Sequence, residues 1–291
     1  MIVVKMQGRL GNQLFGYAFG LTLQALSGQH VSCDCLSLDN GLASPGRRLF
    51  YWLQILLGRR VNKLELASMG LRARRASVWQ LGRRRFRVVN ESDVGGVAGL
   101  KELLRDGRDL YFDGFWQRAE WFSAIEDRIR REFRFQRTLP EPAASLLSEI
   151  RSCNAVAVHV RRGDYVQNPR TAAAHNVCTL SYYEAAMDLI AAKVTGPRFF
   201  VFSDDIAWCK AHMGQRRGDL VFVDTVSPRV PHLDLELMMA CRHFVVANSS
   251  YSWWGAYLGA SPDKVVVAPS VWNRLHLEQR PQCGEWILLP G

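Results

Sequence analysis

Two adjacent arginines, Arg161 and Arg162, lie in the turn of this sequence that is richest in reactive side chains. His159 comes just before them and Asp164 just after them. Arginine binds phosphate oxygens through a planar fork of N–H donors and stays charged at any physiological pH. Two guanidinium groups in one turn therefore indicate a phosphate site. The alternative is a surface Arg–Asp ion pair, and the crowding of four polar side chains into one turn argues against it.

Two further polar clusters also follow apolar runs that are typical of buried strands. Adjacent carboxylates suit a guanine edge or ribose hydroxyls, whereas serine hydroxyls and free N–H groups at a helix start suit a phosphate. The alternatives are turn stabilisation by the carboxylates and plain N-capping by a serine. The two aspartates are adjacent and not spaced as DxD, so no metal is expected. These clusters are Asp204 with Asp205, and Asn248 with Ser249 and Ser250.

A fourth cluster stands near the N-terminus, in the loop between an expected strand at residues 2–6 and an expected helix at residues 14–26. A tight strand-to-helix turn would explain the glycines of this loop, but it would leave three polar side chains unexplained. The loop matches neither the GxGxxG dinucleotide pattern nor the GK[ST] phosphate loop. The three polar side chains are Arg9, Asn12 and Gln13.

The elements that must position these clusters are parallel strands. Residues 155–160 form a short β-branched run, in which alternation places Val156, Val158 and Val160 on one face and His159 on the other. Gly163 is expected to free the backbone for the turn that follows. Strand and helix patterns alternate onward to residue 268, which predicts an α/β fold with helices on both faces of the sheet. All four clusters follow strands, and so they are expected to converge on one cleft.

The chain of 291 residues, 48% of them hydrophobic, is long enough for two domains. A break in pattern at residues 138–142 places the boundary so that the domains are 1–140 and 141–291. The last helix is expected to pack back on the first domain. A helix at 181–193 is expected to begin with Ser181 as its cap, and Trp116 and Trp121 are expected to lie in a core more often than on a sugar platform.

Composition restricts the compartment and the partners. No apolar run of 18 residues occurs, and the N-terminus lacks the pattern of a signal peptide. The seven cysteines are scattered, so free thiols in the reducing cytoplasm are expected. The net charge is +10, and seven arginines fall within residues 72–87. This basic segment is either a solvated face or a surface for anionic lipid, nucleic acid or an anionic substrate.

Four motifs together resemble the α-1,2-fucosyltransferases of glycosyltransferase family 11. They are HVRRGDY at 159–165, FVFSDD at 200–205, NSSYSWWGAYL at 248–258 and GRLGNQLFGYA at 8–18. The resemblance implies a GT-B fold, with two Rossmann-like domains that face a central cleft. It also implies GDP-fucose as donor, a terminal β-galactoside as acceptor, inversion at the anomeric carbon and no bound metal or other cofactor. The chain looks like the bacterial members that build O-antigen and other surface glycans.

The resemblance also implies roles for individual residues. Arg161 would hold the β-phosphate, and Asn12 would lie near the reacting oxygens. The nucleotide would otherwise be held by Asp204, Ser249 and Ser250, while Arg162, Asp205 and Asn248 complete the predicted donor site. Arg9 and Gln13 are assigned to the acceptor side or to its loop.

The galactose hydroxyl must lose a proton as it attacks the sugar. Asp164 is the first candidate for the general base and His159 the second. A carboxylate beside two arginines is a weak base, because the positive charge stabilises its ionised form. Asp164 therefore has a second interpretation, in which it only orients Arg161.

Other classes of function receive less support. A nucleic-acid-binding protein would rely on the basic segment alone, which offers only Trp79 and Phe86 for stacking. A nucleotide-sugar epimerase or reductase would need a glycine fingerprint and a Tyr-xxx-Lys pair, and Tyr183 is followed at that spacing by Met187. A sugar-binding module without catalysis would not need two adjacent arginines. Another transferase that uses a GDP-sugar remains open. A lipid-linked acceptor, with contact between the enzyme and the inner face of the cytoplasmic membrane, is also expected.

Overall fold

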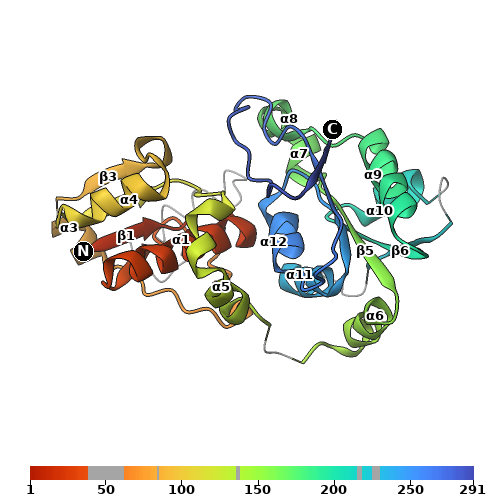
Figure 1. The fold of residues 1–291 in the computed structure, drawn as a ribbon, viewed down its shortest axis with the longest axis horizontal. Helices are drawn as coiled ribbons and strands as arrows, with labels where there is room; N and C mark the ends of the chain where they lie inside the picture. The colour runs from red at the N-terminus through yellow and green to blue at the C-terminus, as the bar shows by residue number, and fades with distance from the viewer. Residues whose placement is uncertain (39–61, 84, 136–137, 215–217, 225–229) are drawn as a thin grey trace, which may run out of the picture. The chain divides into compact units, whose positions relative to one another are not determined.

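The computed structural model describes residues 1–38, 62–83, 85–135, 138–214, 218–224 and 230–291. The chain divides into two compact units, Met1–Gln136 and Arg137–Gly291. Each unit contains one parallel sheet with helices packed against it, so the α/β class is confirmed (Figure 1).

The sheet of the first unit has the strand order β2-β1-β4-β3, with all neighbours parallel. The apolar run after Met1 forms β1, and its first three residues are buried because they lie in the middle of the sheet. The strands are β1 (Ile2–Lys5), β2 (Val31–Asp34), β3 (Arg87–Asn90) and β4 (Leu110–Asp113). Sequence patterns had not indicated β2 or β3.

Helix α1 (Leu10–Ser27) follows β1 and packs against β1 and β2. It begins four residues earlier than expected, because the Glu65 carboxylate accepts a hydrogen bond from the Leu10 N–H at 2.8 Å. It ends at Gly28, which has a φ of 67° and forms a left-handed C-cap.

An aromatic cluster fills the core beneath α1. The Phe19 ring stacks on Trp116 with centroids 4.0 Å apart, and it meets Trp121 edge-on. Both tryptophans are buried, which confirms that they are core residues. Two short 3₁₀ turns, Ala119–Trp121 and Ser123–Ile125, carry the chain past this cluster. The other helical elements described in this unit are Leu66–Met69, Glu91–Asp93, α3 (Val78–Arg83), α4 (Gly96–Arg105) and α5 (Glu126–Glu132).

The sheet of the second unit has the strand order β10-β9-β8-β5-β6-β7, again with all neighbours parallel. The chain enters at β5, builds outward through β6 and β7, and then returns to the other side of β5 with β8. Strand order therefore reverses between β5 and β8, where open α/β sheets bind ligands. The strands are β5 (Asn154–Val160), β6 (Pro197–Ser203), β7 (Leu220–Phe222), β8 (His243–Val245), β9 (Val266–Pro269) and β10 (Ile287–Leu289).

Helices cover both faces of this sheet, as strand alternation predicts. Val156, Val158 and Val160 face a core shared with α9 (Leu180–Lys193) and α10 (Ile206–His212). His159 faces the other side, where its ring lies 5.5 Å from that of Tyr251. Figure 1 shows the second set of helices on that side of the sheet. These are α6 (Glu141–Arg151), α11 (Pro231–Ala240) and α12 (Ser250–Leu258), and two short helices, α7 (Gly163–Gln167) and α8 (Pro169–His175), follow β5.

Two expectations about this unit are wrong in detail. Helix α9 is capped by Thr179, whose hydroxyl accepts a hydrogen bond from the Tyr182 N–H at 3.3 Å, and not by Ser181. The last element is strand β10 and not a helix, and β10 pairs in parallel with β9 at the edge of this sheet. Trp286 lies in this unit too, with its ring centroid 5.8 Å from that of Trp253. No helix in the described part of the chain is long and apolar enough to cross a bilayer.

Candidate functional site

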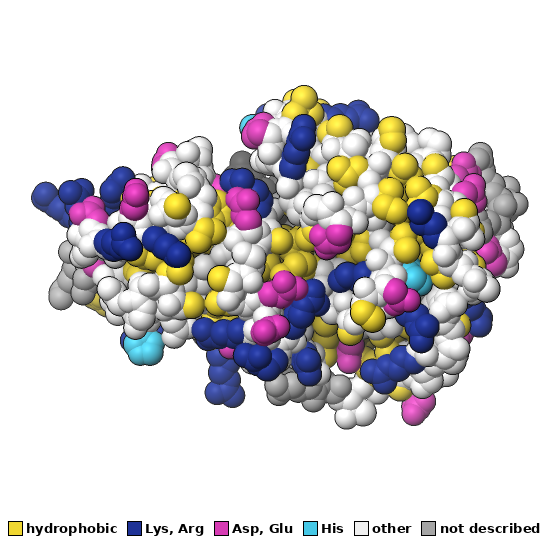
Figure 2. Space-filling model, in the orientation of Figure 1, with side chains coloured by type: hydrophobic (Ala, Val, Ile, Leu, Met, Phe, Trp, Pro, Cys, Tyr) yellow, Lys and Arg dark blue, Asp and Glu magenta, His cyan; other side chains and the backbone are white. Residues whose placement is uncertain are grey.

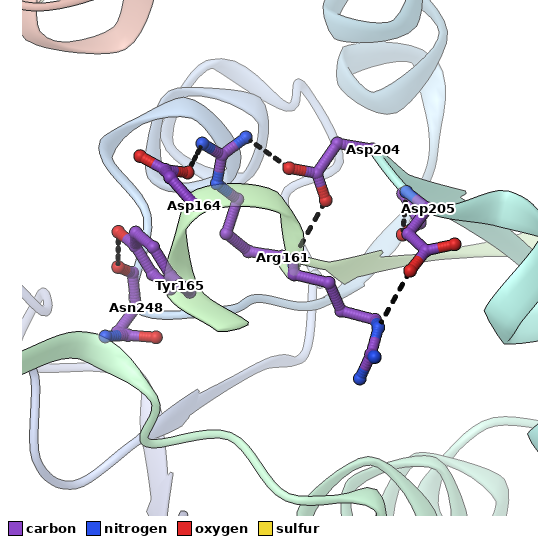
Figure 3. A network of polar contacts seen from close by, with 8 residues as sticks. Arg161, Asp164, Tyr165, Asp204, Asp205 and Asn248 are labelled. Atoms are coloured by element: carbon purple, nitrogen blue, oxygen red, sulfur yellow. Dashed lines mark hydrogen bonds and ion pairs between the residues drawn. The ribbon is translucent and has the colours of Figure 1, made fainter. Parts of the chain in front are cut away.

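Three of the four predicted polar clusters meet at the carboxyl ends of the neighbouring strands β5, β6 and β8 (Figure 3). Arg161 is at the centre of this group. Its NH1 lies 2.7 Å from Asp204 Oδ2, and its NH2 contacts Asp164. The Arg161 side chain is only 15% exposed. Residues from two strand ends therefore fix one guanidinium group at the edge of the sheet.

Arg162 turns away from Arg161 and has its own partners, as alternation along an extended chain predicts. Its Nε lies 3.2 Å from Asp205 Oδ2, and its guanidinium carbon lies 3.7 Å from the centre of the Trp208 ring. The Arg162 backbone N–H donates to Asp204 Oδ1 at 2.9 Å. Arg162 thus ties the end of β5 to the start of α10.

Gly163 is required here by packing and not by its backbone angles. Its φ is not among the positive values of this chain, so the expected need for a freer backbone is wrong. A Cβ at this position would lie 2.4 Å from Asp204 Oδ2. Only glycine lets the Asp204 carboxylate approach close enough to reach both Arg161 and the Arg162 N–H.

The two aspartates after β6 perform the structural work that was the alternative to ligand binding. Asp204 accepts from Arg161 and from the Arg162 backbone. Asp205 caps α10 by accepting from the Trp208 N–H at 3.2 Å, while its own N–H donates to Ser203 Oγ at 3.0 Å. Their side chains remain 29% and 38% exposed, so both carboxylates also face solvent.

The cluster after β8 divides into a structural residue and a helix start. The Asn248 side chain is buried, and its Nδ2 donates to the carbonyls of His175 and Trp272 at 3.0 and 2.9 Å. Ser249 is the N-cap of α12, but its side chain makes no capping hydrogen bond. The N-terminus of α12 carries the positive end of the helix dipole, which favours an anion.

Tyr165 and His175 belong to the same network, although sequence reasoning assigned them no role. The Tyr165 hydroxyl donates to the Asn248 carbonyl at 3.0 Å, and its ring stacks on His175 with centroids 5.0 Å apart. The Arg161 guanidinium carbon lies 5.3 Å from the Tyr165 ring centre. Burial raises the pKa of Tyr165 and lowers that of His175. The position of Tyr165 inside the HVRRGDY motif could have assigned it to the site, whereas no motif in the sequence contains His175.

His159, the second candidate base, is 5% exposed and lies in the layer between the sheet and α12. Asp164 contacts Arg161 directly. Geometry therefore favours a carboxylate that holds an arginine, and it gives His159 no open path to a substrate in the described unit.

The fourth cluster lies in the first unit, at the loop between β1 and α1. Gln13 is fully buried, with Nε2 donating to the carbonyls of Gly8 and Lys63 and Oε1 accepting from the Glu65 N–H. It therefore holds the loop together. Asn12 is partly exposed and accepts from Gln117 Nε2 at 2.8 Å, and Arg9 is exposed. Glu65 and Gln117 were not indicated by the sequence.

The charges around Arg161 are nearly balanced. Two guanidinium groups face three carboxylates, those of Asp164, Asp204 and Asp205. A bound diphosphate would therefore need positive potential besides the arginines, and the N-terminus of a helix such as α12 is a source of it. No group of three or more His, Cys, Asp or Glu side chains in the described ranges is arranged to hold a metal ion.

Comparisons with known proteins agree with the four motifs. The model of the family described as "Glycosyl transferase family 11" matches residues 104–289. The chain is 34% identical to the O-antigen biosynthesis glycosyltransferase WbnK of Escherichia coli, over 98% of this chain and 99% of the relative. It is 29% identical to an alpha-1,2-colitosyltransferase of Escherichia coli, over 99% of this chain and 98% of the relative. It is 33% identical to the human galactoside alpha-(1,2)-fucosyltransferase 1, over 58% of this chain and 48% of the relative.

One solved structure, that of POFUT1 in complex with GDP-fucose, shares the fold. It aligns over 92% of this chain and 97% of its own, with a TM-score of 0.50 and 15% sequence identity. The family match spans more than half of the chain, and a relative above 30% identity aligns along almost all of it. This chain therefore belongs to glycosyl transferase family 11.

Proposed function

We propose that this transferase moves L-fucose from GDP-β-L-fucose to the 2-hydroxyl of a terminal β-galactoside and inverts the anomeric carbon. The observation that carries the proposal is the position of Arg161. It is fixed where strand order reverses, between β5 and β8, and α12 begins directly after the cluster that follows β8. Arginines and helix N-termini stabilise charge that develops on a leaving diphosphate. The human relative, a galactoside alpha-(1,2)-fucosyltransferase by name, supports the acceptor and the linkage.

In this proposal the second unit binds the donor. The diphosphate contacts Arg161 and the first turn of α12, with Ser249 and Ser250 beside it, and the nucleoside lies toward Asp204 and Asp205. Asn248 and Tyr165 act by position, because their polar groups bond to other protein atoms. Arg162 acts by position through its contacts with Asp205 and Trp208. The proposed arrangement is the GT-B type, in which Asn12 and Arg9 of the first unit face the donor and the acceptor across a cleft.

The experiment is incubation of the purified enzyme with GDP-fucose and a panel of β-galactosides, followed by linkage analysis of the product. We expect a fucosyl-α-1,2-galactoside. Transfer to another hydroxyl would refute the linkage, and absence of transfer to every galactoside would refute the acceptor class.

A second candidate donor is GDP-colitose, because one full-length relative is an alpha-1,2-colitosyltransferase. Colitose lacks the 3-hydroxyl of fucose. A site that hydrogen-bonds a substrate hydroxyl rejects an analogue without it by a large factor, roughly 10⁴ or more. The ratio of kcat/KM for the two donors therefore decides between them: a large preference for GDP-fucose supports the first proposal, and a preference for GDP-colitose replaces it.

The relative that acts in O-antigen biosynthesis supports a role in the assembly of surface glycans. We propose that the enzyme works in the cytoplasm, where nucleotide sugars are made, and that it needs no metal or other cofactor. A lipid-linked galactoside is the acceptor that such a role requires.

A further inference from the structure

The basic segment, residues 72–87, carries a second chemical feature besides its arginines. Three of the eight large apolar side chains that are exposed among the described residues fall within residues 72–88. These are Val78, Trp79 and Val88, and Trp79 is the most exposed of all eight, at 72%. Trp79 therefore exposes apolar ring surface that burial against another body would remove from water.

The arginines of the same stretch are exposed as well. Arg72, Arg74, Arg75, Arg85 and Arg87 are all solvent-facing, while the side chains of Arg83 and Arg84 lie outside the described part. Arg87 lies 3.6 Å from Asp106, and Arg72, Arg74 and Arg85 form no ion pair with a described residue. The sequence from 72 to 88 contains no acidic residue. At least Arg72, Arg74 and Arg85 therefore present positive charge that no carboxylate in the described residues pairs with.

The fold explains why the stretch is a surface. Arg75 pairs in parallel with Cys33, beyond the outer edge of the first sheet, and β3 forms the opposite edge. The chain from Arg75 to β3 must cross the sheet, and α3 lies on this crossing. Figure 2 shows Lys and Arg side chains where Figure 1 draws α3 and β3.

We infer that the 72–88 surface docks this protein on a bilayer of anionic phospholipid. Arginines are attracted to the negative surface of such a leaflet, and tryptophan prefers the boundary between headgroups and acyl chains. Nucleic acid is the competing partner, because it offers the same charge. An exposed tryptophan flanked by Val78 favours lipid, because valine gives bases nothing to stack on. The inference goes beyond the proposed transfer.

The test is sedimentation of the whole protein with vesicles of phosphatidylcholine, with and without phosphatidylglycerol, at low and at physiological salt. Each cation near an anionic leaflet is worth roughly fivefold in affinity. Arg72→Gln combined with Arg85→Gln should therefore weaken binding to anionic vesicles by roughly 25-fold. The matched control is Arg151→Gln with Lys193→Gln, which removes two exposed cations from the second unit and should change little.

Trp79→Ala tests whether the 72–88 surface binds lipid or another anionic partner, because only lipid should bury the tryptophan ring. Burial of a large apolar side chain is worth at least roughly tenfold, so this variant should lose that factor, while Leu277→Ala, 62% exposed in the second unit, should not. Equal binding to neutral and anionic vesicles would overturn the inference. So would full binding by Trp79→Ala together with displacement of vesicles by duplex DNA, which would indicate a nucleic-acid surface. Vesicle binding needs neither donor nor acceptor, so failure here leaves the proposed transfer standing.

Discussion

Arg161 is the side chain on which the proposed chemistry depends most directly. Loss of a donor that stabilises developing charge costs about 2.7–4 kcal/mol, or roughly 10²–10³ in turnover. We expect Arg161→Ala to lower kcat by that order while the protein still folds. Arg161→Lys should restore little, because lysine cannot reach Asp164 and Asp204 with one planar fork.

Arg162→Ala is the matched control for Arg161, since it removes a neighbouring arginine with partners of its own. Its contacts with Asp205 and Trp208 join two elements, so the variant should lower the melting temperature more than kcat. Turnover, GDP affinity by calorimetry and thermal melting are the measurements. Near-native turnover in Arg161→Ala would refute the phosphate assignment.

Asp164 contacts Arg161, which makes its two interpretations separable by experiment. If the carboxylate holds the arginine, Asp164→Asn should weaken GDP binding and kcat by similar factors, because the amide keeps one acceptor oxygen but loses the charge. If it is the general base, kcat alone should fall and GDP affinity should stay. The structure leads us to expect the first result.

His175 gives a pH dependence whose sign can be worked out. Burial lowers its pKa below 6.5 in the folded state, so the unfolded chain binds more protons once the pH falls toward and below 6.5. Folded stability is therefore lost on acidification. Phenylalanine would keep the stack on Tyr165 without titrating. We expect the free energy of unfolding of His175→Phe to fall less than that of the parent protein when the pH is lowered from about 7.5 to about 5. Urea unfolding at the two pH values is the measurement.

His30→Phe is the control, because His30 is an exposed histidine in the first unit. Its unfolding should follow the pH dependence of the parent protein. An unchanged slope in His175→Phe would show that His175 does not contribute to acid sensitivity.

At the scale of elements, the turn between β5 and α7 is the critical join. Gly163→Ala would place a Cβ 2.4 Å from Asp204 Oδ2, and this oxygen cannot move freely because it holds Arg161. Overpacking of this kind costs about 1–3 kcal/mol. We therefore expect a lower melting temperature and weaker GDP binding. Gly218→Ala, at an exposed glycine with no atom within 4 Å of the added Cβ, should change neither.

Helix and strand positions in the second unit could be read from the sequence because local patterns decide them. Residues 155–160 were expected to be a strand, and β5 is Asn154–Val160 with the expected faces. The starts of helices were less predictable. Leu10 is capped by Glu65, a residue 55 positions away, and no local signal could show this. The strands β2 and β3 were missed for a related reason, because they are short and their order in the sheet is set by contacts distant in sequence.

At the scale of the whole molecule, the prediction concerns metal. The proposed leaving group is stabilised by an arginine and by a helix start, so catalysis should not depend on a divalent cation. Turnover with GDP-fucose should persist in excess EDTA. A parallel assay with added Mg²⁺ or Mn²⁺ is the control, and activity that EDTA abolishes and metal restores would contradict the prediction.

The sequence by itself determined the α/β class and the family. Four motifs were enough for the family, because the types and spacing of residues such as those in HVRRGDY are local properties that survive without coordinates. The turn of Arg162 away from Arg161 toward Asp205 has a local cause too, because successive side chains of an extended chain point to opposite sides.

Only the tertiary structure decided which carboxylates hold Arg161 and why residue 163 is glycine. It also decided that the amides of Gln13 and Asn248 donate hydrogen bonds to backbone carbonyls. It also decided that His159 is buried against Tyr251 and that Tyr165 stacks on His175. The physical reason is that hydrogen bonds and burial join residues far apart in the chain. The partner of a polar side chain depends on strand order, and strand order is not written in any local pattern.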